Sequence, residues 1–269
     1  MKGKRGTVFA LIVILVAGLG LYAAWRNQEL PDSPIPPDSS SMSAKATRTQ
    51  TPKNEAVTGK GRYEYSYAGL SPAVAAVNQK EWYLLLVNKG IALPSSYKPG
   101  LAVCLPGIYP ENREMDARVA PKYRDMYYAA LKEGAELIPF SGYRQISTQK
   151  RNFDDAIADY RAQGKSDEEA VQLASQSIMP PGCSEHEAGL AMDITRKGVW
   201  ETRLDFEDSK EFAWLQAHAA EYGFILRYPR GKEAVTGVGY EPWHWRYVGV
   251  EAAKAMKANG KCLEEYLGR

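Results

Sequence analysis

Two short segments of the chain carry the residue types that metal-assisted hydrolysis needs. His186 and Asp193 stand seven positions apart in the first, and Glu241 and His244 stand three apart in the second. Two imidazoles and one carboxylate are a typical ligand set for a catalytic zinc ion, which keeps a fourth position open for water. Such an ion lowers the pKa of its water to about 7, and Glu241 is close enough to touch that water. The sequence therefore predicts a zinc-dependent hydrolase with His186, Asp193 and His244 as ligands.

Each of these residues also has a common structural role when it is considered alone. A buried histidine often only satisfies hydrogen bonds, and an aspartate is usually a cap, a turn or a surface residue. The two segments together favour the metal site, because they hold two of the three histidines in the chain. Gly189 and Ala191 flank the strand expected to carry Asp193, where larger side chains would crowd a metal pocket.

The two segments have recognisable patterns, SxHxxGxAxD from Ser184 to Asp193 and ExxWH from Glu241 to His244. Together they resemble the VanY-type D-alanyl-D-alanine carboxypeptidases, of the superfamily that includes lysostaphin-type peptidases and the hedgehog signalling domain. The resemblance also covers residues 84–89, 141–144, 227–229 and 245–249. It implies one zinc ion per chain on His186, Asp193 and His244. It also implies that Glu241 is the general base, which takes a proton from the water at the zinc and passes it to the leaving amine.

The same resemblance implies roles for five residues outside the ligand set. Arg144 would face the substrate near the metal, where its fixed fork of donors suits a carboxylate or a developing oxyanion. The terminal carboxylate or the adjoining backbone of the substrate would be held by Gln149, Ser184 and Tyr228. The aromatic ring of Trp243 would line the pocket. The structural alternatives are a surface salt bridge for Arg144, a turn or cap for Ser184, and core packing for the two aromatic residues.

The chain opens with basic residues and then an uncharged run of 18 residues from Thr7 to Ala24. That length is at the lower limit for a membrane-spanning helix and exceeds a usual signal-peptide core, and a cleavage site is hard to find. We expect residues 1–25 to be an uncleaved single-pass anchor in the cell membrane. The positive-inside tendency then places the remaining chain outside the cell. Secretion after signal cleavage is the alternative.

Residues 26–60 are rich in Pro, Ser, Thr and charged side chains. Such a stretch buries too little apolar surface to offset its ordering entropy, so we expect a flexible linker. A linker of about 30 residues, at roughly 3.3 Å per residue when extended, would let the enzyme reach a wall layer tens of ångströms from the membrane. Residues 61–269 then form the catalytic domain.

The composition restricts the partners. The net charge is +2 at pH 7, with basic residues scattered among acidic ones, so no nucleic-acid binding is expected. Cys104, Cys183 and Cys262 lack the spacing of a structural zinc ribbon. One disulfide and one free thiol are an option outside the cell. Cys183 has the alternative of being a small buried residue in the wall of the site.

Residues 61–269 predict a single compact α+β domain, with a central antiparallel sheet that carries the zinc site and helices packed around it. The helices are expected at residues 71–77, 121–133, two within 148–178, and 208–222, 250–258 and 262–267. The strands are expected at residues 82–87, 136–140, 190–194, 224–228 and 243–247. His186 then lies in a loop and meets Asp193 through a chain reversal, and the last two strands bring Tyr228 beside His244.

Local signals support individual helices. Ser166 with Glu169 three residues later is a capping-box signature for the second helix within 148–178. Gly134 is well placed to end the helix at 121–133, and Gly223 to end the helix at 208–222. His218, the histidine outside the two motifs, is expected to be structural or exposed.

These features together predict a membrane-anchored, monomeric zinc carboxypeptidase that trims the C-terminal D-alanine from peptidoglycan stem peptides or their precursors. The nearest alternative is an L,D-carboxypeptidase, which resembles the D,D enzymes in the same motifs but acts on tetrapeptide stems. A more distant alternative is a non-catalytic wall-binding module that keeps the zinc fold. Glu241 and Arg144 argue against it, because a pure binding module needs no base beside the metal. Cleavage of a peptide cross-bridge, as in lysostaphin-type enzymes, fits the motifs less well.

Overall fold

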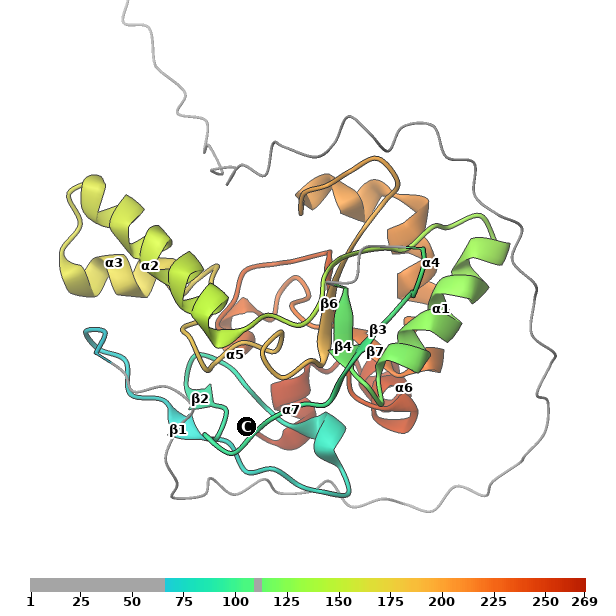
Figure 1. Ribbon diagram of the computed structural model, residues 1–269, viewed down its shortest axis with the longest axis horizontal. Coiled ribbons are helices and arrows are strands. Elements are labelled where there is room, and N and C mark those ends of the chain that lie inside the picture. The colour runs from blue at the N-terminus through green and yellow to red at the C-terminus, as the bar shows by residue number, and fades with distance from the viewer. Residues whose placement is uncertain (1–65, 109–112) are drawn as a thin grey trace, which may run out of the picture. The chain divides into compact units, whose positions relative to one another are not determined.

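The structure is a computed structural model that describes residues 66–108 and 113–269 (Figure 1). The anchor expected at residues 1–25 and the linker expected at 26–60 lie outside the described residues. Within the described part of the chain, no helix has the length and apolar character needed to cross a membrane.

A four-stranded antiparallel sheet forms the centre of the fold. Its strands, in spatial order, are β5 (Ile138–Ser141), β6 (Ala191–Thr195), β8 (His244–Tyr247) and β7 (Phe224–Leu226). Each of the four corresponds to a strand expected from the sequence. The register sets Asp193 of β6 directly beside Ser141 of β5 and His244 of β8. The pairing of the strands therefore brings one candidate ligand next to another.

The two faces of this sheet differ in chemistry, because successive side chains of a strand point to opposite sides. On β6, Met192 and Ile194 join the main hydrophobic core, whereas Asp193 between them points to the other face. On β8, Trp245 also joins the core, between polar neighbours on either side. One face of the sheet is thus apolar, and the opposite face carries the candidate ligands.

Helix α1 (Ala120–Lys132), expected at residues 121–133, packs an apolar stripe against that core. A proline lies in its first turn, where the missing N–H is tolerated. Gly134 follows its end with φ of +80°, as expected for a glycine in a helix cap. The buried residues of the stripe are Tyr123, Met126, Tyr127 and Ala130.

Helices α2 (Ile146–Ala162) and α3 (Asp167–Ala174) form a hairpin to one side of the sheet (Figure 1). The predicted capping box at the start of α3 is confirmed: Ser166 and Glu169 exchange side-chain and backbone hydrogen bonds. The hairpin has a small apolar cluster of its own, which includes Phe153 and Val171. Its first turn follows directly on the segment that leaves β5.

The C-terminal helices cover the far end of the sheet. The expected helix at 208–222 is α4 (Lys210–His218) followed by a 3-10 turn (Ala219–Tyr222), and Gly223 ends it with φ of +86°. Helices α6 (Val250–Asn259) and α7 (Leu263–Leu267) confirm the last two predictions and share a second apolar cluster with Leu84 and Leu86. A short helix, α5 (Glu233–Thr236), lies in the loop between β7 and β8.

Two predictions near the start of the domain were wrong. The expected helix at 71–77 contains instead strand β1 (Ala73–Val74), which pairs in parallel with β2 (Ile91–Ala92). The expected strand at 82–87 begins as a 3-10 turn (Trp82–Leu84) and continues without a partner strand. Its carbonyls accept hydrogen bonds from the side chain of Arg246 instead. In both cases a contact with a distant residue overrides the local pattern.

The sheet layout is also richer than expected, because two small sheets accompany the central one. Besides the β1 and β2 pair, β3 (Leu101–Val103) pairs antiparallel with β4 (Glu114–Asp116). The coarse expectation of one mixed domain of helices and strands holds for the described residues. The central antiparallel sheet is as expected, and the two small sheets were not predicted.

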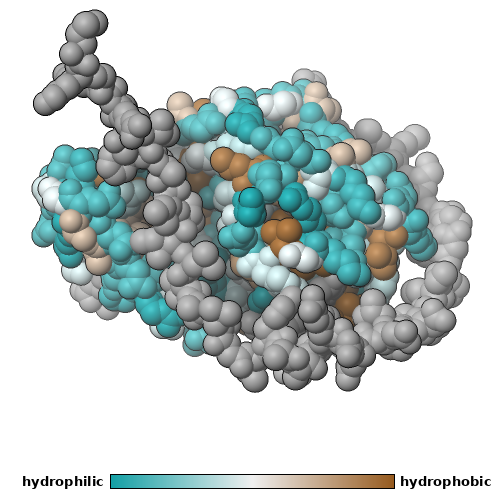
Figure 2. Space-filling view, turned by 90° about the horizontal axis from the view of Figure 1, so that it is seen from above, coloured by the Kyte–Doolittle hydropathy of each residue, from teal (hydrophilic) through white to brown (hydrophobic). Residues whose placement is uncertain are grey.

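The remaining features of the domain are its cysteines, its surface and His218. The three cysteines are buried and no disulfide joins any two of them, so the optional disulfide does not form among the described residues. Figure 2 shows one face that is mainly hydrophilic, with small separate hydrophobic groups. His218 is partly exposed and lies 3.1 Å from Glu221, in line with the structural or surface role expected for it.

Candidate metal centre and active site

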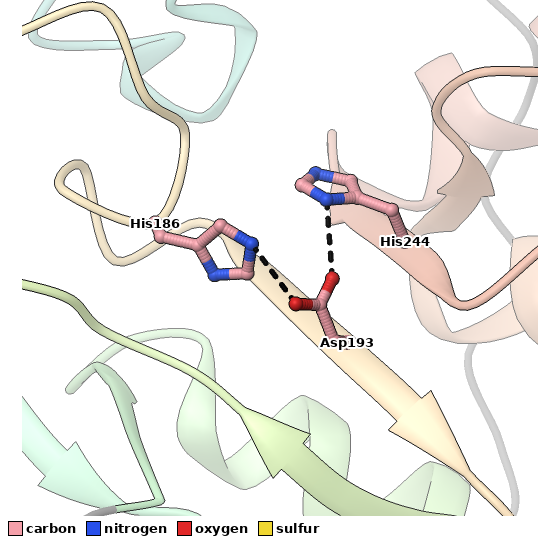
Figure 3. Close-up of side chains that lie close together, drawn as sticks. All are labelled: His186, Asp193 and His244. Atoms are coloured by element: carbon pink, nitrogen blue, oxygen red, sulfur yellow. Dashed lines mark ion pairs between the residues drawn. The ribbon is translucent and has the colours of Figure 1, made fainter. Parts of the chain in front are cut away.

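His186, Asp193 and His244 converge on one buried point (Figure 3). One atom from each of the three residues lies within 4.8 Å of the others. Asp193 lies between the two rings: Oδ2 is 3.4 Å from Nε2 of His186, and Oδ1 is 3.2 Å from Nδ1 of His244. Among the described residues, these three form the group of His, Cys, Asp or Glu side chains with the geometry to hold a metal ion.

His186 lies in the loop before β6, and its orientation is fixed from behind. Its Nδ1 lies 2.8 Å from the carbonyl oxygen of Gly142, which can only accept, so Nδ1 carries a hydrogen and Nε2 is the nitrogen that faces Asp193. Gly142 is necessary for this approach, because a Cβ at this position would lie 2.2 Å from the carbonyl oxygen of Glu114. The backbone that leaves β5 therefore sets which nitrogen of His186 is available.

His244 uses its two ring nitrogens the other way round. Nδ1 faces Asp193, and Nε2 lies 3.3 Å from Oε2 of Glu185. Each histidine thus turns one nitrogen toward the common point and engages the other with a carbonyl or a carboxylate. Histidines that bind metals have this arrangement, because the outer partner fixes both the ring orientation and the tautomer.

The third donor gives a direct test of whether a metal fits. Oδ1 of Asp193 is buried and makes no well-aligned hydrogen bond with any described residue, although Nδ1 of His244 lies 3.2 Å away. A buried polar atom without a partner is costly in a folded protein, and coordination to a cation would satisfy it. Two imidazole nitrogens and a carboxylate oxygen are also the donor set that zinc prefers. The residues present therefore fit a zinc ion.

The charged groups of the site influence the pKa values of one another. Burial alone would raise the pKa of Asp193, but the two neighbouring histidines hold it well below its usual range. Burial lowers the pKa of His186, more than Asp193 raises it. For His244, burial is outweighed by the neighbouring carboxylates of Asp193 and Glu185, which raise its pKa to about 9. In the absence of a metal, His244 therefore carries the proton that balances Asp193.

Glu241 lies beside this group and not within it. Its Oε2 is 3.7 Å from Nδ1 of His244, and its side chain is largely buried. Burial raises the pKa of Glu241 to about 7, against the opposing effect of His244. A carboxylate with a pKa near the working pH is suited to accept and return a proton. Its position is that expected for a base that acts on a water next to the ligands.

Arg144 leaves the end of β5 and reaches the same site. Nη2 lies 4.0 Å from Oδ2 of Asp193 and donates a hydrogen bond to Oγ of Ser141 at 3.0 Å. Nη1 donates to Oε1 of Gln149 at 2.9 Å. The Gln149 amide in turn donates to the carbonyl oxygen of Met179 at 2.6 Å. Gln149, which was expected to contact substrate, is thus buried behind Arg144 and holds its guanidinium in place.

The remaining candidates surround the group at different depths. Ser184 is buried, and its Oγ accepts a hydrogen bond from the backbone N–H of His186 at 3.3 Å. The ring of Tyr228 lies 4.9 Å from that of His244, as the strand order predicted. Trp243 is partly buried against the main core, and its carbonyl oxygen accepts from Ile194 N–H. The structure therefore brings Ser184 and Tyr228 next to the ligands and places Trp243 at the junction of site and core.

Sequence reasoning missed Glu185 and the two arginines that contact it, Arg227 and Arg246. All three side chains are fully buried and form ion pairs at 2.6 and 2.7 Å. The sequence does contain one sign of this cluster: Glu185 is a charged residue between Ser184 and His186, in a segment that must be buried for the site to form.

The reason given for Gly189 was also wrong. Gly189 has φ of +70°, and a Cβ there would lie 2.9 Å from the backbone nitrogen of Asp116. Glycine is needed for this backbone conformation and for the close approach of β4, which donates a hydrogen bond from Asp116 N–H to the Gly189 carbonyl. A side chain at position 189 is therefore excluded by the backbone of Asp116 and not by the metal pocket.

A buried His, Asp and His group with a glutamate poised beside it defines the class of zinc-dependent peptidases with an open coordination position. A family model described as "VanY: D-alanyl-D-alanine carboxypeptidase" matches residues 112–250 of the chain. The chain therefore belongs to the VanY family of D-alanyl-D-alanine carboxypeptidases.

Individual relatives agree with this assignment. The D-alanyl-D-alanine carboxypeptidase of Enterococcus faecalis is 37% identical over 198 residues, which cover 74% of this chain and 70% of that protein. A mutant of the vancomycin-resistance D,D-pentapeptidase VanY, solved with Zn(II), aligns with a TM-score of 0.60 and 38% identity over 70% of this chain and 99% of that one. The LD-carboxypeptidase LdcB aligns with a TM-score of 0.63 and 36% identity, over 73% and 90% of the two chains.

Zinc affinity should depend on pH through His244, because a metal on Nδ1 must displace the proton held there at a pKa of about 9. Release of one proton makes the apparent affinity fall about tenfold for each pH unit below 9, and the dependence flattens above that pH. Competition with a chelator between pH 6 and 9.5 measures this slope. An affinity that stays constant from pH 7 to 9 would contradict a proton on His244.

Proposed function

We propose that this protein removes the C-terminal D-alanine from peptidoglycan stem peptides or their precursors, as a zinc-dependent D-alanyl-D-alanine carboxypeptidase. The observation that carries the proposal is the buried group of His186, Asp193 and His244 with the Glu241 carboxylate 3.7 Å from His244. Membership of the VanY family supplies the substrate class.

The residues of the site divide the work of peptide hydrolysis. His186, Asp193 and His244 would hold the zinc ion, which polarises the scissile carbonyl and supplies hydroxide at neutral pH. Glu241 takes the proton of the attacking water and passes it to the leaving amine of D-alanine. Its pKa of about 7 suits both transfers, because the group must accept and then donate at the same pH.

Arg144 supplies the positive charge that the substrate needs. Two of the five N–H groups of its guanidinium are used by Gln149 and Ser141. The remaining donors are available for the terminal carboxylate of the substrate or for the developing oxyanion. Because Gln149 and Ser141 fix the plane of the guanidinium, Arg144 acts from one orientation. Ser184, Tyr228 and Trp243 are placed to contact the substrate around it.

L,D-carboxypeptidase activity is the second candidate, and a specific observation supports it. The LD-carboxypeptidase LdcB resembles this chain as closely as the VanY D,D-pentapeptidase does, with a TM-score of 0.63 against 0.60. The two activities differ in the tail that is accepted, a pentapeptide ending in two D-alanines or a tetrapeptide.

Assays on pentapeptide and tetrapeptide stems, with and without chelator, separate the candidates. We expect the purified protein to release D-alanine from the pentapeptide, and we expect the chelator to abolish this release because the site loses its metal. Quantification of free D-alanine gives the result. Release from the tetrapeptide alone would move the activity to the L,D class. No release from either stem by the zinc-loaded protein would leave the non-catalytic wall-binding module.

Replacing the base tests the division of roles within the site. Glu241→Gln keeps the shape of the side chain but cannot accept a proton. We expect kcat to fall by about 10² to 10⁴-fold, the usual contribution of a general base, while zinc content stays at the wild-type level. His244→Ala is the matched control, since it should lose zinc as well as turnover. Loss of zinc in Glu241→Gln would mean that Glu241 is a ligand.

The cellular position is a further part of the proposal. The uncharged run from Thr7 to Ala24 after a basic start supports an N-terminal anchor with the domain outside the cell. We expect the full-length protein to sediment with membranes and to be accessible to added protease on the outer face. A variant that lacks residues 1–25 should stay in the soluble fraction of the cell. Recovery of the wild-type protein from the medium with a shortened N-terminus would establish secretion instead.

A further inference from the structure

The candidate zinc ligand His244 is held from its far side by a buried carboxylate that is not itself a ligand. Glu185 is 1% exposed, and its Oε2 lies 3.3 Å from Nε2 of His244. The other ring nitrogen, Nδ1, faces Oδ1 of Asp193 at 3.2 Å. The ring therefore stands between two carboxylates, and only one of its nitrogens can have a lone pair to offer a metal in each neutral tautomer.

Two arginines determine how Glu185 meets this ring. Its Oε1 accepts hydrogen bonds from Nε of Arg227 at 2.7 Å and from Nη1 of Arg246 at 2.6 Å. A guanidinium can only donate, so the atom at this position must be an oxygen acceptor. With Oε1 engaged by both arginines, Oε2 is the atom that faces His244.

The arginines are fixed in turn by residues far away in the sequence. Arg227 donates to both carboxylate oxygens of Glu264 in α7, at 2.8 and 2.6 Å. Arg246 donates through Nη2 to the carbonyl oxygens of Tyr83 and Leu85, at 2.9 and 2.7 Å. Two buried carboxylates balance two buried guanidiniums, so the cluster has no net formal charge. Such a paired and hydrogen-bonded cluster gives Glu185 one well-defined position.

We propose that Glu185 is a positioning residue of the zinc site: it accepts the Nε2–H of His244 and so selects the tautomer whose Nδ1 lone pair faces the metal. The ring of His244 is then held by the cluster of Glu185, Arg227, Arg246 and Glu264 before any metal arrives. This inference rests on the zinc site of the proposed function. It concerns how the metal is bound, and it does not depend on which peptide is hydrolysed.

A purely structural role for Glu185 makes a different prediction. In that case Glu185 only neutralises Arg227 and Arg246, and its loss would lower stability without a specific effect on zinc. Glu264 provides the matched control, because it is a buried carboxylate that pairs with Arg227 in the same cluster but does not contact His244.

Glu185→Gln is the decisive substitution, since its amide has one oxygen and one NH2 group. The oxygen must face the two arginines, which leaves the NH2 group facing Nε2 of His244. A donor at that position favours the tautomer with hydrogen on Nδ1, the nitrogen that the metal needs. We expect zinc affinity of the full-length protein, measured by chelator competition, to fall about 10 to 100-fold, the usual cost of losing an outer partner of a ligand. Glu264→Gln should retain the wild-type affinity even if its melting temperature falls.

The wild-type protein gives a second measurement that does not depend on either variant folding. The chain has three histidines, so their side-chain nitrogens can be resolved by long-range ¹H–¹⁵N correlation in the zinc-loaded full-length protein. We expect His244 to carry hydrogen on Nε2 and to bind through Nδ1. Hydrogen on Nδ1 with metal on Nε2 would overturn the proposal. So would equal losses of zinc affinity in the two variants, or no loss in Glu185→Gln. Loss of peptidase activity with the expected tautomer and affinities would count against the proposed function alone.

Discussion

The need to compensate buried charge determines how this site is built. Asp193 is a carboxylate at 6% exposure, and a charge that far from water is tolerated only with partners at close range. Those partners are His186 and His244, and the sheet supplies one of them by register, because Asp193 on β6 pairs with His244 on β8. The apolar face of the same strands packs on α1 and keeps the register from shifting, since a shift by one residue would send Asp193 into the core.

The second charged layer follows from the same constraint. Glu185 is buried next to His244, and its negative charge is compensated by Arg227 and Arg246. The imidazole ring of His244 therefore lies between two carboxylates, those of Asp193 and Glu185. Removing one partner from such a cluster typically costs about 3 to 5 kcal/mol, because an uncompensated charge stays buried. The cluster also connects the site to α7 and to the segment around Leu85. The metal centre therefore depends on the folding of parts of the chain that never touch the metal.

The extent to which the sequence predicts this structure depends on the range of the contacts. Strands and helices with local periodicity or caps, such as α1, α3 with Ser166, and β6, were expected within a few residues of their ends. Residues 71–77 and 82–87 were assigned wrongly, because their backbone partners are β2 and the side chain of Arg246, which no local pattern reveals. The motif residues could be named from type and spacing, whereas the part played by Glu185 required the orientation of one imidazole ring.

The choice between pentapeptide and tetrapeptide has to be made away from the metal. His186, Asp193, His244 and Glu241 act on an amide bond that releases one D-alanine from either substrate, so they give little discrimination between the two stems. Discrimination must come from groups that meet the substrate on either side of that bond. Arg144 is placed to hold the terminal carboxylate of the leaving D-alanine, which both substrates have, and its direction is set by Gln149, whose amide is anchored on Met179. Discrimination therefore falls to groups that contact the residue on the carbonyl side of the scissile bond, which has the D configuration in the pentapeptide and the L configuration in the tetrapeptide.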